Sequence, residues 1–404
     1  MMALTPVRVA LEALIASVPG PTAPETLPLA DCAGRVLAAD VAALRTHPPF
    51  ANSAMDGYAV RADDIPAGAS LSVIGEAAAG RGFSGTVGTG EAVRIFTGAP
   101  LPDGADTILI QENAEGVGTP TIRVVESTAR GRFVRAAGLD FTQGDVLLTA
   151  GRMLDGAALG LCAAMGHPAL TVRGKPLVAI LATGDELVLP GEPIGPDQIV
   201  ASNSFAIAAL AQAAGARILD LGIARDDHAD LALKIGQARQ AGADVLVTLG
   251  GASVGAHDLV QEALTRQGMT LGFWKIAMRP GKPMMTGRLG PMVALGLPGS
   301  PVSSIVCGHL FLLPLIEALL GLPAPGRDRS ERAILGGDLP ANDEREDYLR
   351  ADLAATPEGW LATPFGKQDS SMLATLAKAK ALIIRPAHAG PAAAGSPCRI
   401  LRLR

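Results

Sequence analysis

The stretch Asp244-Val-Leu-Val-Thr-Leu-Gly-Gly-Ala-Ser-Val-Gly255 decides the fold of this chain. Residues 244–249 form a short, almost uninterrupted apolar run, which predicts a strand buried on both faces of a parallel sheet. Gly250 and Gly251 follow, where the backbone can take a positive φ and approach a ligand closely. A segment with helical character, 258–267, comes next. Strand, glycine loop and helix place free amides at the carboxyl edge of a sheet, so we predict an anion-binding site there.

Three known motifs nearly fit this loop. The dinucleotide fingerprint fails because Ala252 stands where a second glycine is needed, and the Walker A motif fails because no lysine follows Gly255. The five residues 251–255 match the nucleophile elbow of hydrolases, with Ser253 as nucleophile. In that elbow the serine runs straight into a helix, whereas Gly255 intervenes here. A serine hydrolase is therefore a disfavoured alternative that stays open.

Strands and helices alternate on both sides of this stretch. Further apolar runs at 177–181, 218–223 and 292–297 predict three more strands of a doubly wound parallel sheet. Asn203 or Ser204 can cap a helix that runs to residue 214, and the pair Asp226-Asp227 can cap the next one. The long apolar segment 302–320 contains His309, Pro314 and Glu317, which favours a core helix over a membrane span.

The flanking sequence has a different pattern of apolar residues and turns. An amphipathic helix near residue 10 precedes short strands and glycine turns, and period-two alternation returns in the last part of the chain. The fold class is therefore multidomain α/β plus β. We expect four parts: an N-terminal and linking α+β region (1–45 and 141–174), an inserted β domain (46–140), an α/β domain (175–326) and a small C-terminal β-barrel-like domain (327–404).

Composition excludes several classes of protein. Of 404 residues 49% are hydrophobic, which is too apolar for a disordered chain, and the net charge of −5 argues against a general nucleic-acid binder. Cys32, Cys162, Cys307 and Cys398 are far apart, so buried reduced thiols are expected and a zinc site is not. Neither a secretory signal nor a membrane segment is convincing. These features predict a cytoplasmic protein.

Six motifs occur in a characteristic order. They are Pro49-Phe50 with Asn52-Ser-Ala-Met-Asp-Gly-Tyr-Ala-Val60, Phe96-Thr-Gly-Ala99, Ala182-Thr-Gly-Asp-Glu-Leu187, Gly250-Gly-Ala-Ser-Val-Gly255, Pro280-Gly-Lys-Pro283 and Gly296-Leu-Pro-Gly-Ser-Pro-Val-Ser303. Each alone is weak, but together they are specific. The chain resembles, over nearly its whole length, the MoeA family of molybdopterin molybdenumtransferases and the related E domain of gephyrin.

The resemblance implies an enzyme of molybdenum cofactor biosynthesis. Such an enzyme inserts molybdate into the dithiolene of adenylylated molybdopterin and releases AMP, with a divalent cation such as Mg²⁺. The α/β domain would be the molybdopterin-binding domain, similar to MogA. An elongated homodimer with an active cleft shared between subunits is implied, with the molybdopterin adenylyltransferase and acceptor molybdoenzymes as further partners. A non-catalytic molybdopterin-binding scaffold, as in gephyrin's anchoring role, is the alternative.

Candidate residues follow from chemistry and resemblance together. The catalytic candidates are Asp56 in a turn beside glycine, Thr97 at a strand end, and Glu186 at the carboxyl edge of a strand. The anionic substrates need cations and free amides. The substrate-binding candidates are Gly250, Gly251, Ser253, Gly255, Lys275, Arg279, Lys282, Pro298, Ser300, Pro301, Arg350 and Ser371. Arg350 and Ser371 rest on the resemblance alone.

Metal binding is expected from oxygen ligands. Asp227 and Asp258 are the candidates for Mg²⁺, although each can also be a helix N-cap, an alternative that the helical segment after Asp227 favours for that residue. The chain departs from the family pattern at Ala51, where an acidic residue is common, at Arg279, where lysine is frequent, and at Ser300, where asparagine is usual. The planar guanidinium of Arg279 keeps the charge but changes the anion geometry.

Overall fold

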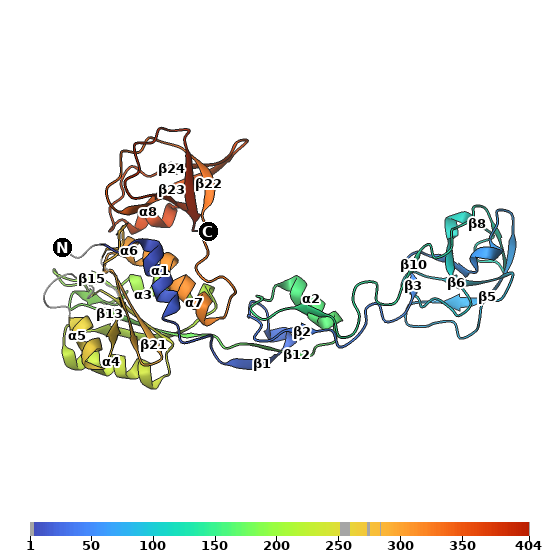
Figure 1. Cartoon of the computed structure of the whole chain (residues 1–404), viewed down its shortest axis with the longest axis horizontal. Coiled ribbons are helices and arrows are strands. Elements are labelled where there is room, and N and C mark those ends of the chain that lie inside the picture. The colour runs from blue at the N-terminus through green and yellow to red at the C-terminus, as the bar shows by residue number, and fades with distance from the viewer. Residues whose placement is uncertain (1–3, 251–258, 273–274, 283, 404) are drawn as a thin grey trace.

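The protein is elongated, and its parts follow one another along the long axis (Figure 1). This computed structural model describes residues 4–250, 259–272, 275–282 and 284–403. The α/β domain and the C-terminal barrel lie at one end, a small linking region lies in the middle, and the inserted β domain lies at the other end. The four expected parts are recognisable, whereas the residue limits assigned to them stay a prediction.

The central sheet of the α/β domain has the strand order β16-β13-β17-β21-β20-β18. Its first four strands are parallel, as the sequence predicted: β16 (Arg217–Ala224), β13 (Leu177–Thr183), β17 (Val245–Leu249) and β21 (Met292–Leu297). Two antiparallel strands that the sequence did not predict extend the sheet: β20 (Met285–Leu289) and β18 (Thr270–Leu271).

Helices cover both faces of this sheet. Val178 and Ile180 of β13 point into one core, and Ala179 and Leu181 point into the other. The first core is closed by α1 (Val7–Ala16), α3 (Asn203–Ala213), α6 (Pro301–Cys307) and α7 (Leu313–Leu319). The second core is closed by α4 (His228–Gln240) and α5 (Leu259–Arg266). All of β17 is buried. Its nearly continuous apolar sequence makes burial on both faces of the sheet possible.

Two local expectations are corrected. Helix α1, expected in the N-terminal region, packs through Ala10 and Leu14 in the α/β core. Helix α3 begins at Asn203, and its N-cap residue Ser202 makes no side-chain capping bond; the Asn203 amide instead donates to the Gly299 carbonyl over 2.8 Å.

The apolar segment Pro301–Leu319 is long and apolar enough to cross a membrane, but 72% of it is buried inside the protein. It comprises α6, a π-helical turn at Gly308–Leu312 and α7. The predicted core helix is therefore confirmed. Such burial is the usual property of a helix that packs against a sheet on one side and other helices on the other.

The linking region joins two distant stretches of chain. Strand β1 (Pro24–Pro28) pairs with β12 (Ala169–Arg173), and β2 (Val41–Ala42) pairs with β11 (Val146–Leu148). Helix α2 (Gly156–Ala164) adds Cys162 to the same small core, which also contains Cys32. All four cysteines are free thiols, and Cys398 alone is not fully buried.

The inserted domain contains one sheet of order β7-β4-β6-β5-β9-β8. Its strands are β4 (Gly57–Val60), β5 (Ser70–Ala77), β6 (Glu91–Ile95), β7 (Thr107–Ile110), β8 (Ala114–Glu115) and β9 (Thr121–Val124). At its base, β3 (Asn52–Ser53) pairs with β10 (Val134–Arg135), so the entering and leaving segments are joined.

The C-terminal sheet closes on itself, since β25 pairs with both β26 and β23, which confirms the barrel-like domain. Its elements are β22 (Glu331–Leu335), β23 (Glu346–Thr356), β24 (Gly359–Pro364), α8 (Leu373–Lys378), β25 (Ala381–Arg385) and β26 (Pro397–Arg402). Strand β19 (Met278–Arg279) of the preceding region pairs with β23, so the barrel is attached to the α/β domain by backbone hydrogen bonds.

Candidate functional site

Asp56 and Thr97 meet at the base of the inserted domain. The Thr97 backbone N–H and hydroxyl both donate to Asp56 Oδ1, each over 2.8 Å. These two donors, with a smaller contribution from the nearby Arg94 guanidinium, hold the pKa of the Asp56 carboxyl below its ordinary value. Thr97 is exposed and Asp56 is half-buried, so the carboxylate is charged and reachable from solvent.

Two glycines and an arginine make this contact possible. A Cβ at Gly57 would lie 2.1 Å from the Leu109 carbonyl oxygen, so the strand that follows Asp56 can pack only with glycine there. Gly98 has φ +82°, which turns the chain directly after Thr97. Arg94 donates to the carbonyl of Gly57 and stacks over Tyr58. The sequence motifs around residues 56 and 97 are thus two halves of one structure.

A second group of candidates lies at the carboxyl edge of the α/β sheet. Gly250 ends β17 with φ +97°, as predicted, and a Cβ there would lie 2.8 Å from the Thr183 carbonyl oxygen. The Gly250 N–H donates to the Leu297 carbonyl, and Gly299 lies against Gly250. Glycine is therefore required at position 250 because the ends of the neighbouring strands approach it closely.

Three carboxylates gather beside this edge. Glu186 follows β13 and leads into β14 (Leu187–Val188), which pairs with β15 (Ile199–Val200). Asp226 follows β16, and its N–H donates to Asp185 Oδ1. Although Asp226 keeps exposed surface, partial burial of its carboxylate raises its pKa, and repulsion from Asp185 and Glu186 adds to this effect.

The sequence analysis placed Asp185 in a motif and Asp226 in a helix cap, but it did not identify either as a member of this site. Their positions gave a usable signal, because β13 and β16 are neighbours and residues after neighbouring parallel strands lie at the same edge. Asp227 instead caps α4, as the alternative interpretation predicted: its two carboxylate oxygens accept from the N–H groups of Ala229 and Asp230.

The three basic candidates differ in their pairing with carboxylates and in their exposure. Arg279 is paired with Asp347 and Asp343 of the C-terminal domain, and it also donates to the Asn342 side chain. Lys275 is half-buried and Lys282 is exposed. Since Arg279 is already paired with two carboxylates, an anionic ligand would have to compete for it.

Ser300 and Pro301 begin α6, with the Ser300 hydroxyl donating to Ser303 over 2.8 Å. The following Val302 N–H donates to the Ser370 carbonyl, which brings the loop that contains Ser371 to the same helix end. Pro298 directly follows strand β21 and begins the short segment that leads to this helix. These substrate candidates from the α/β domain and the barrel are therefore adjacent.

Arg350 is buried, with 1% of its surface exposed, whereas most arginines lie at the protein surface. Its guanidinium donates to the Gln368 side chain and the Asp369 carbonyl, and burial lowers its pKa. The Ser371 hydroxyl and N–H both donate to Asp369 Oδ1 and hold the pKa of that carboxyl down. Arg350 and Ser371 thus belong to one hydrogen-bonded loop.

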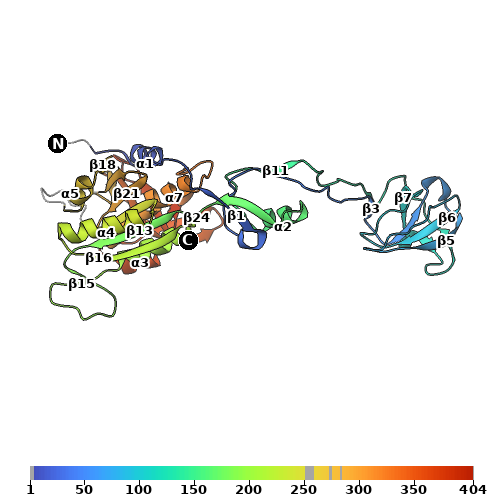
Figure 2. The ribbon, with the colours of Figure 1, turned by 90° about the horizontal axis from the view of Figure 1, so that it is seen from below.

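The Asp56 pair and the sheet edge do not meet within one chain. Strand β13 begins directly after β12 of the linking region, so its carboxyl end, where Glu186 follows, is directed away from the inserted domain. Figures 1 and 2 both show the inserted domain and the α/β domain at opposite ends of the molecule. Any site that uses both must therefore involve a second subunit.

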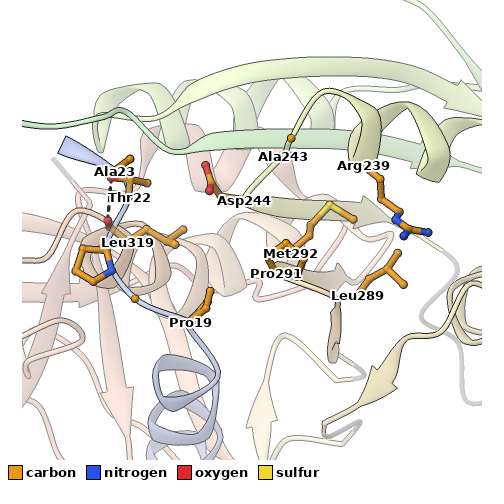
Figure 3. A pocket seen from close by; sticks show the side chains of 13 residues that line it. Pro19, Thr22, Ala23, Arg239, Ala243, Asp244, Leu289, Pro291, Met292 and Leu319 are labelled. Carbon is orange, nitrogen blue, oxygen red and sulfur yellow. Dashed lines mark hydrogen bonds between the residues drawn. The ribbon is translucent and has the colours of Figure 1, made fainter. Parts of the chain in front are cut away.

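A cavity of about 470 Å³ lies at the opposite edge of the same sheet (Figure 3). Its lining includes Asp244, which precedes β17, Arg239 at the end of α4 and Pro19 of the segment after α1. Because it lies at the amino ends of the strands, where parallel sheets do not carry their ligands, it is not the candidate site.

The remaining candidates Gly251, Ser253, Gly255 and Asp258 lie outside the described residues. The hydrolase alternative and half of the metal prediction therefore stay untested. Over the ranges that the structure does describe, no group of three His, Cys, Asp or Glu side chains is arranged to hold a metal ion.

Comparison with known families decides how these sites are to be understood. Residues 5–166 match the MoeA N-terminal region (domain I and II), residues 179–318 a probable molybdopterin binding domain, and residues 332–403 the MoeA C-terminal region (domain IV). The chain belongs to the MoeA family. The family resemblance inferred from the six motifs is thereby confirmed.

Individual members of the MoeA family match over almost the whole chain. The molybdopterin molybdenumtransferase of Haemophilus influenzae is 34% identical, with 96% of each chain covered. Molybdopterin molybdenumtransferase 2 of Mycobacterium tuberculosis is 35% identical, over 93% of this chain and 94% of its own. A crystal structure of a MoeA protein from Pyrococcus horikoshii is 30% identical and superimposes with a TM-score of 0.85 over 100% of both chains.

Proposed function

We propose that this protein is a molybdopterin molybdenumtransferase that inserts molybdate into the dithiolene of adenylylated molybdopterin and releases AMP. The observation that carries the proposal is the match, over nearly the full length of both chains, to relatives with that name. The match includes both the inserted domain with Asp56 and the α/β domain with Glu186.

The proposed catalytic residues are Asp56, Thr97 and Glu186. Molybdate is a dianion, so a carboxylate beside it is useful only if it delivers a proton to a leaving oxygen or acts through a cation. Asp226 lies close enough to Glu186 for the two carboxylates to repel each other, and this repulsion adds to the effect of burial in raising the pKa of Asp226. Asp56 is held as an anion by the two hydrogen bonds from Thr97, which lower its pKa.

Substrate binding is assigned to the edge of the α/β sheet and the adjoining barrel loop. Lys275 and Lys282 would hold the pyrophosphate, and the loop candidates Gly251, Ser253 and Gly255, which lie outside the described residues, stay proposed substrate contacts. Arg279 contributes to the positive field while it stays paired with Asp347. Arg350, Ser371 and the segment Pro298–Pro301 would complete this binding surface.

Mg²⁺ is proposed only as a cofactor implied by the family resemblance. Of its two candidate ligands, Asp227 caps α4 with both oxygens, and Asp258 lies outside the described residues. Since no three-ligand group forms among the described residues, the donor set does not fit a Mg²⁺ site by itself, and we assign no step to the ion.

A homodimer with a composite cleft is the proposed active unit. The support is the separation of Asp56 from Glu186 within one elongated chain. A two-fold dimer would create two such clefts, each with the inserted domain of one subunit and the α/β domain of the other.

The proposed cellular setting follows from this reaction. The protein would act in the cytoplasm, receive its substrate from the molybdopterin adenylyltransferase and pass the product to acceptor molybdoenzymes. Neither nucleic acid nor a membrane is a proposed partner. The non-catalytic scaffold would bind the substrate without releasing AMP.

Incubation with adenylylated molybdopterin, Mg²⁺ and molybdate, with AMP release followed by chromatography, tests the proposal. We expect release only when molybdate is present. Release independent of molybdate, or none with competent substrate, would falsify it. Ser253→Ala is the matched control, since it should leave a molybdenumtransferase active and abolish a serine hydrolase.

A further inference from the structure

Arg94 lies beside the contact between Asp56 and Thr97 and carries a positive charge that no carboxylate balances. It is a half-buried residue of β6, and its guanidinium donates to two neutral acceptors, the Gly57 carbonyl over 3.2 Å and Gln111 Oε1 over 2.8 Å. Among the residues that the structure describes, no Asp or Glu forms an ion pair with it. Charged groups that leave solvent are usually paired in proteins, so an unpaired arginine at this place indicates a function.

Two aromatic rings hold this guanidinium in place. Its central carbon lies 5.0 Å from the centre of the Tyr58 ring and 5.1 Å from the centre of the Phe96 ring. The faces of aromatic rings attract a cation and favour its charged form, but they carry no net charge that could cancel it. Arg94 is therefore fixed in position and keeps its full positive charge.

Arg94 and Gln111 together form a bracket around the turn that carries Asp56. The Gln111 N–H donates to the Asp56 carbonyl over 3.2 Å. The Gln111 side chain accepts from Arg94, which also donates to the carbonyl of Gly57. Strand β6 ends one residue after Arg94 and leads to Thr97. The bracket thus joins the turn with Asp56 to the strand whose end supplies both hydrogen bonds to that carboxylate.

The charges that face Asp56 have clear origins. Its lowered pKa is caused first by the N–H and hydroxyl bonds from Thr97, which is neutral, and the charge of Arg94 adds to the effect. On the side of Gln111, the exposed carboxylate of Glu112 accepts from the Gln111 amide nitrogen over 3.4 Å. An anion that approaches Asp56 is repelled by its carboxylate and attracted by Arg94, so the guanidinium offsets the repulsion that a dianion would otherwise meet.

We infer that Arg94 is a positioning residue of the reaction, which holds the Asp56 turn against Thr97 and supplies the positive charge that lets a dianion approach Asp56. Gln111 is its anchor. The inference rests on the proposed function, whose substrate molybdate is a dianion. It adds a charge requirement to the half of the site that the inserted domain carries.

The substitution Gln111→Glu tests the charge without breaking the bracket. It keeps an oxygen acceptor for Arg94 but gives the guanidinium a carboxylate partner, which cancels its charge. Asn113→Asp is the matched control, because it adds the same charge to the same short helical turn, Gln111–Asn113, at a side chain that forms no hydrogen bond with Arg94. Arg94→Gln removes the charge from the other side, and Arg94→Lys keeps the charge but loses the planar fork.

The pKa of the Asp56 carboxyl is measured by carbon NMR titration of the full-length protein with labelled aspartate carboxyls, and its signal is identified by its absence in Asp56→Asn. The pKa should rise in Gln111→Glu and in Arg94→Gln, because the loss of nearby positive charge destabilises the carboxylate. It should stay near the wild-type value in Arg94→Lys and Asn113→Asp. Thermal unfolding of each variant checks that it is folded. A merely structural role predicts no rise in Gln111→Glu, since the new ion pair keeps the bracket.

Steady-state kinetics of molybdate-dependent AMP release separate the charge from the geometry. Gln111→Glu should raise the KM for molybdate by about five- to tenfold, and the increase should shrink as salt screens the added charge. Arg94→Lys should instead lower kcat by about ten- to a hundredfold with little change in KM, since a lysine cannot hold both Gly57 and Gln111.

An unchanged pKa of Asp56 in Gln111→Glu and Arg94→Gln would overturn the inference, as would an equal rise in Asn113→Asp. The NMR titration needs no substrate, so it is independent of the proposed reaction. The expected pKa changes in a wild type and variants that release no AMP would refute the proposed function alone. Molybdate-dependent AMP release with an unchanged KM in Gln111→Glu would refute this inference alone.

Discussion

Asp56 directly precedes strand β4 and Asp226 follows strand β16, but their surroundings shift the pKa values of the two carboxyls in opposite directions. The backbone N–H and the hydroxyl of Thr97 each donate to Asp56 and stabilise its charged form. Burial and the charges of Asp185 and Glu186 destabilise the charged form of Asp226. The inserted domain thus carries a carboxylate whose charged form is stabilised, and the α/β domain carries a carboxylate whose charged form is destabilised.

The largest effect is expected from removing a charge in either region. Asp56→Asn and Glu186→Gln should each lower turnover by about 10²- to 10⁴-fold, the usual contribution of proton transfer, while binding of adenylylated molybdopterin stays nearly normal. Steady-state kinetics and a binding titration measure the two quantities. Asp63→Asn, an exposed carboxylate paired with Arg130, is the control within the inserted domain and should change neither.

An intermediate effect is expected at Lys282. Lys282→Ala should weaken substrate binding by about 1.5–3 kcal/mol, because an exposed lysine is proposed to meet the pyrophosphate equally in the ground state and the transition state. The change should appear in KM more than in kcat. If Lys282→Ala binds normally while the carboxylate variants lose the substrate, the two groups of residues have exchanged roles.

A smaller effect is expected from the Thr97 hydroxyl. Thr97→Val removes one of the two donors to Asp56, so the pKa of Asp56 should rise toward its ordinary value of 3.8. The lowered pKa of Asp56 means that the charged carboxylate contributes stability at pH values above its ordinary pKa. That contribution is lost as pH falls through the folded-state pKa. The acidic limb of the pH–kcat/KM profile should therefore move to higher pH. Thr97→Ser keeps both donors and should not shift it.

The smallest effect concerns stability at Asp226. Its raised pKa means that the folded state loses stability as pH rises from the ordinary value of 3.8 through the raised value. Asp226→Asn should therefore increase the midpoint of urea unfolding at neutral pH, and the gain should vanish at about pH 4 or below. Asp145→Asn is the control, and it should change the unfolding midpoint in the opposite direction. Hydrogen bonds from Thr142 lower the pKa of Asp145, so removing this carboxylate should destabilise the protein. A gain for Asp226→Asn that is independent of pH would contradict the comparison.

Much of the fold was predictable because its pattern is local. The apolar run from Asp244 to Leu249 required burial on both faces, and glycine at position 250 required a special backbone conformation. The strands β18 and β20 were missed, because glycines interrupt the segment and its pairing depends on the finished sheet. The placement of α1 was missed for the same reason, since its apolar face suits any core.

The site was predictable residue by residue but not as an arrangement. Motifs identified Asp56 and Thr97 separately, whereas the contact between them depends on the inserted domain's sheet. The burial of Arg350 and the pairing of Arg279 with Asp347 depend on the barrel being joined to the α/β domain through β19. Such contacts join residues far apart in sequence, and no local pattern encodes them. The roles of these residues stay predictions.

The central claim is that the two carboxylate regions form one site across two subunits, and subunit mixing tests it most directly. Asp56→Asn and Glu186→Gln protomers, each inactive alone, are mixed under conditions of verified subunit exchange, and molybdate-dependent AMP release is measured. A mixed dimer contains one cleft with both carboxylates intact, so it should regain about a quarter to half of wild-type activity per dimer. No recovery after exchange would contradict the composite site.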